Sequence, residues 1–432
     1  MALGGVVGEA SAGYFSYQLR LNPSRLTQAL LFLCLLLSGC TLKEQVPIRV
    51  GILYLRTGPL ADNERAITQS TSLAIEELQA RGGLLGRPLE IVLSRESAGL
   101  EEFAQEAERL IAEEKVDVLF GCWSSASRKV VLPVLQRHQH LLFYPLQYEG
   151  LEQSPYVVYT GAVPNQQLVP AVKWSLDNLG RRVFLVGSDY IYPHIANGIA
   201  RDQMTALGAE VVGEEYIAFG GTDVTEVIES IRKAKPDVIL NTINGDSNLA
   251  FFKSLKAAGL DSIPTMSTSA AEGEFRQMGA EMPVGHYATW AYFESLDTPG
   301  NRAFVERYHQ RFGVGKAVTS PMESGYFSVR LWAQAVEAAN SATPAEVRKN
   351  VGGQSWAAPE GIVSIDPSNL HTWKSVRVGR LNSDGQFEVQ WSSAGPVRPR
   401  PYPPYQSKEV WDAKLQSLFE GWGESWIGET AL

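Results

Sequence analysis

Short apolar runs alternate with segments of helical period in two successive series, and this alternation limits the fold more than any other feature of the chain. Short strands separated by helices are typical of βαβ units around a parallel sheet. Two such series predict an α/β protein with two doubly wound parallel-sheet lobes. The expected strands are residues 48–54, 89–93, 116–120 and 141–144 in the first series, and 183–186, 211–217, 238–243 and 265–266 in the second.

Several crossings of the chain are expected to join the two lobes in a multi-strand hinge. Residues 398–432, rich in Pro and Trp, are expected to form a tail that wraps a surface. Residues 361–393 have a β pattern, in which Ser383-Asp384-Gly385 predicts a hairpin turn. We expect 48–162 with 291–345 to form the N-terminal lobe, and 163–290 with 346–397 to form the C-terminal lobe.

The N-terminus has the pattern of an export signal. Arg20 and Arg25 precede an uninterrupted apolar run, 29–37, that spans only about 14 Å as a helix, short of the roughly 30 Å hydrocarbon core of a bilayer. This pattern predicts a signal peptide over 1–39 and a tether over 40–47. Leu37-Ser38-Gly39-Cys40 also resembles the lipobox of bacterial lipoproteins, which implies a lipidated Cys40 and a membrane-anchored, periplasmic or cell-surface location. The alternative is a plain signal peptide with a chance cysteine.

Charge and motifs argue against several classes of function. The chain has 38 Lys and Arg against 47 Asp and Glu, a formal net charge of −9, which disfavours nucleic acid as the main partner. No Gly-rich phosphate loop and no G-x-S-x-G elbow occurs, and the six His residues are scattered. Ser124, Ser125 and Ser127 have no identifiable base beside them. The sequence therefore predicts no enzyme, no cofactor and no metal site.

Aromatic and polar residues follow the predicted strands. Ligands of open α/β sheets bind beyond the carboxyl ends of strands, so we expect these residues to line a site. The candidates are Trp123, Ser125, Tyr144, Gln147, Tyr190, Asn244, Asp246, Ser269 and Glu272. Aromatic walls with converging hydrogen-bonding groups suit a small, planar, uncharged ligand. The alternatives are that Asp246 caps a helix and that Trp123 packs between the lobes.

Five segments resemble the type I periplasmic binding proteins of the urea and short-chain amide group: 121–129, 144–150, 187–193, 241–248 and 295–299. Within that group the chain looks most like the urea-binding lipoproteins of bacterial ABC transporters. The resemblance implies the type I periplasmic-binding-protein fold, a membrane permease as partner, and a ligand in the interlobe cleft. Amide-sensing regulators share this fold, but they lack a signal peptide and lipobox and have a Tyr where Trp123 stands.

We therefore expect a receptor that closes about its hinge over urea. Urea carries four N–H donors and one carbonyl acceptor, so its pocket must supply several acceptors. Asp246 and the Gln147 carbonyl are the expected acceptors, and Ser125 is an expected donor. The alternatives are a receptor for short-chain amides, a ligand-sensing amide regulator, or a receptor for branched-chain amino acids. An amino acid would be held at its carboxylate by Ser124 and Ser125, and at its ammonium by Asp246 or Glu272.

Overall fold

The computed structural model describes residues 13, 45–54, 58, 60–95 and 99–428. Residues 46–432 form one compact unit, which is described below. Cys40 and almost all of the predicted signal peptide lie outside the described residues. Among the described residues, no helix combines the length and the apolar character needed to cross a bilayer.

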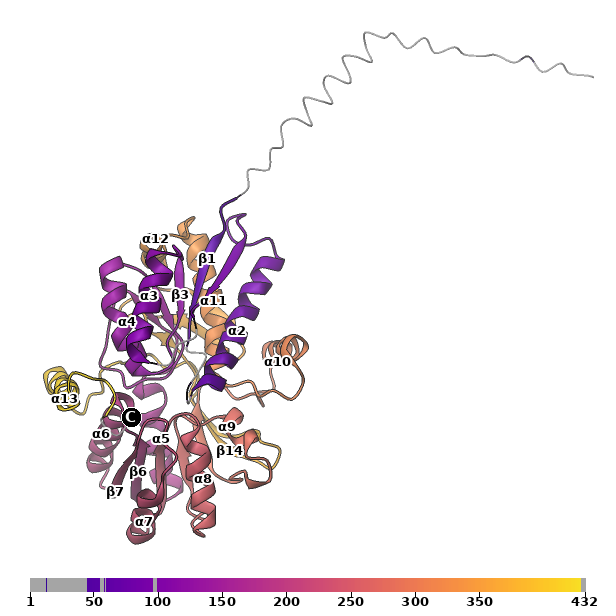
Figure 1. Ribbon diagram of the computed structural model, residues 1–432. Coiled ribbons are helices and arrows are strands. Elements are labelled where there is room, and N and C mark those ends of the chain that lie inside the picture. Colours follow the sequence, from indigo (N-terminus) through magenta and orange to yellow (C-terminus); the bar gives the residue numbers. More distant parts are fainter. Residues whose placement is uncertain (1–12, 14–44, 55–57, 59, 96–98, 429–432) are drawn as a thin grey trace, which may run out of the picture. The chain divides into compact units, whose positions relative to one another are not determined.

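The first lobe is built on a parallel sheet of five described strands. Its strand order is β2 (Leu89–Leu93), β1 (Ile48–Leu53), β3 (Val118–Gly121), β4 (Leu142–Tyr144) and β5 (Val157–Tyr159). The covering helices include α2 (Ala61–Ala80), α3 (Leu100–Ala112), α4 (Ser125–His138) and α11 (Ser320–Ala339). Figure 1 shows α3 and α4 on one side of β1 and β3, and α2 and α11 on the other. Because helices cover both faces, β3 and β4 are buried throughout, as their continuous apolar runs predict.

The second lobe contains a sheet of seven described strands. Its strand order is β15 (Phe387–Ser392), β14 (Arg377–Leu381), β10 (Tyr287–Trp290), β9 (Thr265–Ser267), β8 (Val238–Thr242), β6 (Arg182–Ser188) and β7 (Glu210–Ile217). β14 pairs antiparallel with both β10 and β15, and the remaining pairs are parallel. The helices of this lobe include α5 (Leu168–Asn178), α6 (Ile191–Ala206), α7 (Thr225–Ala234), α8 (Ser247–Ala257) and α9 (Glu272–Gln277).

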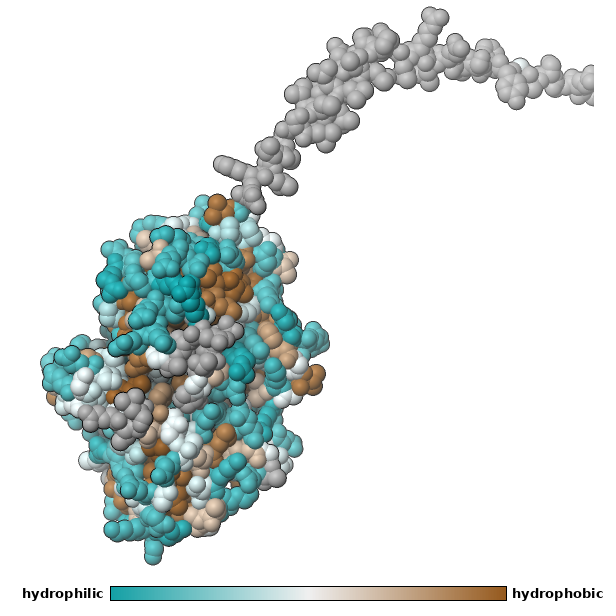
Figure 2. Space-filling model, in the orientation of Figure 1, coloured by the Kyte–Doolittle hydropathy of each residue, from teal (hydrophilic) through white to brown (hydrophobic). Residues whose placement is uncertain are grey.

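Successive side chains of β6 point to opposite faces of this sheet and enter two different hydrophobic cores. Val183 and Leu185 belong to the hydrophobic core shared with α5 and α6, whereas Phe184 and Val186 belong to the core shared with α7 and α8. Both cores are enclosed, and Figure 2 shows that the visible face of the lobes is mainly hydrophilic, with smaller hydrophobic areas. The predicted α/β fold with two parallel-sheet lobes is confirmed.

One part of the predicted lobe assignment differs from the structure. Residues 346–397 were expected in the second lobe, but Val347, Val351 and Val363 are buried in the first core. The reason is that α12 (Pro344–Asn350) and β11 (Ser355–Ala358) pack on α11, and β12 (Gly361–Ile365) and β13 (Thr372–Trp373) pair in a small antiparallel sheet with β11. Only β14 and β15 of this segment join the second sheet.

Within the predicted β pattern of residues 361–393, the chain is interrupted between β13 and β14. Residues 374–376 carry the chain from one lobe to the other, and Lys374 is buried there with its Nζ 3.0 Å from the Glu360 carboxylate. The other crossings lie between β5 and α5 and between β10 and α10 (Pro299–Phe312). The hairpin turn predicted at 383–385 does join β14 to β15, with Gly385 at a φ of 72°.

Candidate ligand-binding site

The carboxyl ends of strands from both lobes meet at one place, where two hydrogen bonds cross between the lobes. The Trp123 indole Nε1, just after β3, donates to Asn244 Oδ1, just after β8, at 3.2 Å. The Gln147 Nε2, after β4, donates to Ser269 Oγ, after β9, at 3.3 Å. All four side chains are buried. The two walls are therefore in direct contact, and the arrangement is that of a closed cleft.

Asn244 is held in place by the second lobe. Its backbone N–H donates to Ser188 Oγ at 3.0 Å, and its Nδ2 donates to the Tyr190 hydroxyl at 2.8 Å. Burial raises the pKa of Tyr190 well above its usual value, so the phenol stays neutral. Because its oxygen accepts from Asn244, the Tyr190 hydroxyl proton is directed elsewhere and can serve a ligand.

Trp123 is oriented by the first lobe. The Tyr144 hydroxyl donates to the Trp123 carbonyl at 3.0 Å, and the preceding Cys122 has a φ of 64°, which turns the chain sharply at the end of β3. Cys122 is completely buried, and burial raises the pKa of its thiol, which is therefore inert at neutral pH.

Gln147 offers a free acceptor. Its Nε2 is used by Ser269, but its Oε1 is buried and finds no hydrogen-bond partner among the described residues. A buried carbonyl left unpaired costs about 1–3 kcal/mol. A ligand N–H placed at this oxygen would remove that cost.

Ser125 is the first residue of a buried ionic network. Its hydroxyl donates to one carboxylate oxygen of Glu149, and the other oxygen of Glu149 lies 3.1 Å from Arg128 Nη2. Arg128 Nε is 2.9 Å from Glu152, which also pairs with Lys129 at 3.2 Å. The network thus holds two cations and two carboxylates.

Aromatic rings around Arg128 and the cations beside Glu152 both stabilise the charged form of this network. The Arg128 guanidinium lies over the rings of Tyr144 and Tyr148, 4.6 and 4.4 Å from their centroids. Burial opposes ionisation of Glu152, but Arg128 and Lys129 outweigh burial and lower the pKa of Glu152 to about 2. The Arg128 guanidinium is therefore already engaged by two carboxylates and has little left to offer a ligand.

Ser125 was predicted as a site residue, but the charged members of the network were not. Their signal is present in the sequence, since Arg128 and Lys129 stand one helical turn after Ser125, and Glu149 and Glu152 lie in the loop after β4. The sequence does not say that these charges are buried, and burial is what makes them pair.

Two predicted residues form no hydrogen bond with the other candidates among the described residues. Asp246 is exposed at the start of α8, and partial burial and the nearby Asp62 carboxylate raise its pKa. Glu272 is completely buried at the start of α9, where its Oε1 accepts from the Glu294 N–H at 3.1 Å. Burial raises the pKa of Glu272 to about 8, and the Glu294 carboxylate adds to this effect.

A cavity of about 370 Å³ adjoins the site. Trp123 and Ser269 contribute to its lining, together with residues of α2, α9 and the 315–319 loop. Asn63 Nδ2 on α2 donates to Glu274 Oε1 on α9 across this cavity at 2.7 Å. The described residues include no cluster of His, Cys, Asp and Glu suited to a metal ion.

A profile of the periplasmic binding protein domain matches residues 48–408. The chain belongs to the periplasmic binding protein family. This periplasmic binding protein is of type I and of the ABC-transporter kind, as the sequence predicts. The family works outside the cytoplasm with ABC permeases as partners.

Relatives and solved structures agree on this assignment. The Leu/Ile/Val-binding protein homolog 6 of Brucella melitensis is 25% identical over 279 residues, covering 62% of this chain and 71% of that protein. A solute-binding protein of R. palustris, solved with 4-hydroxybenzoate, is 25% identical with a TM-score of 0.74, covering 82% of this chain and 98% of that one. A leucine-binding protein of Thermotoga maritima, 20% identical with a TM-score of 0.72, covers 80% of this chain and 98% of its own and shares the fold.

One relative with an enzyme's name matches only in part. The limonene hydroxylase of Geobacillus stearothermophilus is 30% identical over 149 residues, which are 33% of this chain and 27% of that protein. The matching family and solved structures are those of binding proteins and not of enzymes, in line with the prediction from the sequence.

Proposed function

We propose that this protein binds urea in the closed cleft and delivers it to an ABC permease. The observation that carries the proposal is the Glu149 carboxylate, which is buried and bound to the Ser125 hydroxyl at the strand ends. A ligand at this wall meets a carboxylate that is already paired with Arg128, and the described residues of the wall offer no free cation. An uncharged molecule with N–H donors fits such a wall, and a carboxylate does not.

The hydrogen-bonding groups support a neutral diamide. Gln147 Oε1 is a buried acceptor without a partner, and the Tyr190 hydroxyl has a proton to donate to a carbonyl oxygen. The walls approach to direct hydrogen-bonding distance, which favours a ligand of a few non-hydrogen atoms. Because Asp246 is exposed, we assign the main acceptor role to Gln147 and leave Asp246 at the rim.

The relatives favour a different ligand class, which the site argues against. The relatives are named for branched-chain amino acids and one was solved with 4-hydroxybenzoate, and each of these compounds carries a carboxylate. Binding them here would require a cation or several free donors. Ser125 and Arg128 are both committed to Glu149, so these ligands are expected to bind weakly.

The predicted export signal and lipidated Cys40 belong to the same proposal. They would keep the receptor at the outer face of the membrane, beside the permease. Mass spectrometry of the membrane-associated protein would detect the acyl group on Cys40.

Calorimetry on the chain from Thr41 onward tests the proposal. We expect one-site binding of urea, with acetamide weaker by roughly 5- to 150-fold because its methyl group leaves one acceptor unpaired. Leucine, a zwitterion, and 4-hydroxybenzoate, an anion, are the competitors that carry a carboxylate. If either competitor binds tightly and urea does not bind, the proposed ligand is wrong, although the assignment as a receptor still holds.

A further inference from the structure

The C-terminal end of the chain extends past the family match and packs against the second lobe. The family profile ends at residue 408, where α13 (Lys408–Gly421) begins. Trp411 and Leu415 of α13 are buried in the core that contains Ile195 and Ile199 of α6. Figure 1 shows α13 beside α6. The segment is thus an integral part of the fold.

Residues 426–428 run antiparallel along the strand end that carries Tyr190. Ile427 and Tyr190 form a β-bridge. The Ile191 N–H donates to the Trp426 carbonyl at 3.1 Å, and the Gly428 N–H donates to the Asp189 carbonyl at 3.0 Å. A Cβ at position 428 would lie 2.2 Å from an Asp189 carboxylate oxygen, so the fit is tight. The segment fixes the backbone from which Tyr190 reaches Asn244.

The residue before Ile427 contacts the other lobe. Lys129 Nζ, on α4 of the first lobe, lies 4.7 Å from the centroid of the Trp426 ring, and Phe419 of α13 packs against that ring with centroids 4.4 Å apart. Lys129 is also the partner of Glu152 in the network that holds Glu149 and Ser125. The adjacent residues Trp426 and Ile427 therefore reach the two opposite walls of the site.

We propose that the segment Trp426–Gly428 is a positioning element that ties the two walls together when the cleft is closed. Ile427 keeps the segment on the Tyr190 wall. The contact between the Lys129 ammonium and the Trp426 ring is lost when the Ser125 wall moves away from the Tyr190 wall. The tie therefore stabilises the closed form, and its main effect is on how slowly a ligand leaves.

The first test measures ligand binding and rests on the proposed function. Trp426→Leu keeps an apolar side chain and removes the ring face, while Trp391→Leu on the exposed face of β15 is the matched control. We expect Trp426→Leu to weaken urea binding roughly three- to tenfold through faster dissociation, with an unchanged association rate. The control should match the parent.

The Lys129→Met variant tests whether Lys129 is the partner of the Trp426 ring. In that background, Trp426→Leu should have little further effect on urea binding, because the cation is already gone. An equal loss in both backgrounds would overturn the contact with Lys129 as the tie.

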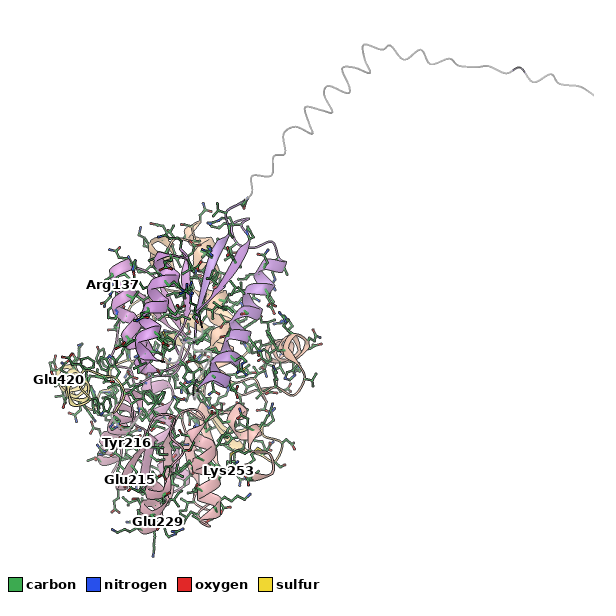
Figure 3. All side chains as sticks on the ribbon, viewed as in Figure 1. Arg137, Glu215, Tyr216, Glu229, Lys253 and Glu420 are labelled. Carbon is green, nitrogen blue, oxygen red and sulfur yellow. The ribbon has the colours of Figure 1, made fainter. Side chains whose placement is uncertain are left out.

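The second test needs no ligand. Spin labels at Arg137→Cys on α4 and Lys253→Cys on α8 report the distance between the lobes, since both side chains are exposed and Figure 3 shows them at the surface of different lobes. The chain from Thr41 contains the whole compact unit and leaves only the buried Cys122 as native thiol. Trp426→Leu should shift the ligand-free distribution toward longer distances.

The outcomes of the two tests separate the two proposals. If the parent fails to bind urea but Trp426→Leu opens the labelled protein, the ligand assignment is wrong and the tie stands. An unchanged distance distribution in both Trp426→Leu and a chain ending at Gly421 would overturn the tie, whatever the ligand.

Discussion

The Gln147 amide donates to the Ser269 hydroxyl across the cleft at 3.3 Å, while its own carbonyl oxygen is buried with no partner among the described residues. One side chain therefore joins the lobes and still offers an acceptor. Gln147→Leu should weaken urea binding by roughly 5- to 150-fold, since about 1–3 kcal/mol is at stake, and acetamide binding by less. Calorimetry with both ligands measures the difference. Gln310→Leu on exposed α10 is the control, and an equal loss for both ligands would contradict the assigned acceptor.

Glu149 is expected to determine whether the site binds an uncharged or an anionic ligand. Glu149→Gln leaves Arg128 with a single carboxylate, Glu152, and so adds a net positive charge beside Ser125. We expect lower stability in guanidinium unfolding, by about 1–3 kcal/mol, and weaker urea binding. We also expect 4-hydroxybenzoate to raise the Tm of this variant more than that of the parent. Glu337→Gln, exposed on α11, controls for the substitution itself, and an anion response equal to the parent's would argue against the electrostatic exclusion of anions.

Asn244 is buried and Asp246 is exposed, so replacing each one should affect urea binding differently. Asn244 bonds Trp123, Ser188 and Tyr190, so Asn244→Ala should weaken urea at least tenfold. Asp246→Ala, two residues further on, should change urea affinity by less than about twofold, because an exposed carboxylate interacts weakly. If Asp246→Ala instead weakens urea more than acetamide, the carboxylate reaches the ligand as the sequence pattern suggests.

Glu272 makes stability depend on pH. Its folded-state pKa of about 8 is above the usual value of about 4.3, so the folded protein binds a proton that the unfolded chain has lost. The contribution of Glu272 to stability should therefore fall as pH rises from about 5 to 8, by up to about 1.4 kcal/mol per unit. His140, His286 and His371, whose pKa values burial lowers to about 4, act with the opposite sign up to about pH 6.5, so the comparison with a Glu272 variant isolates this contribution. Guanidinium unfolding of Glu272→Gln should show a flatter dependence over this window. Glu152 acts with the opposite sign and only below about pH 4.5, since its folded-state pKa is lowered, so it does not mask the effect.

Much of the fold follows from local pattern. Residues 183–186 and 238–243 predict strands because buried parallel strands need unbroken apolar runs, and they are β6 and β8. The lobe assignment of 346–365 was wrong because the apolar residues of α12 and β12 suit either core, and only packing against α11 decides. α13 was not predicted as a helix, since its Trp-rich surroundings suggested only a tail.

Four of the candidate site residues lie at strand ends and are in contact in the structure. Trp123, Gln147, Asn244 and Ser269 meet because the carboxyl ends of parallel strands converge. The exposure of Asp246 was not predictable, since it depends on the turn at Gly245, with a φ of 66°, and on where the opposite lobe stands. The partners of Glu149 depend on burial, which a loop sequence does not show.

The order of strands along the chain has a consequence for how the protein is made. β10 in the second sheet pairs with β14, and the long helix α11 that covers the first sheet begins only at residue 320. Neither lobe is therefore complete until more than three quarters of the chain has been synthesised. Contacts between residues so distant in sequence form slowly. Because neither core can form early, the chain remains unfolded for longer after synthesis begins. An unfolded chain can still be exported, and this family works outside the cytoplasm.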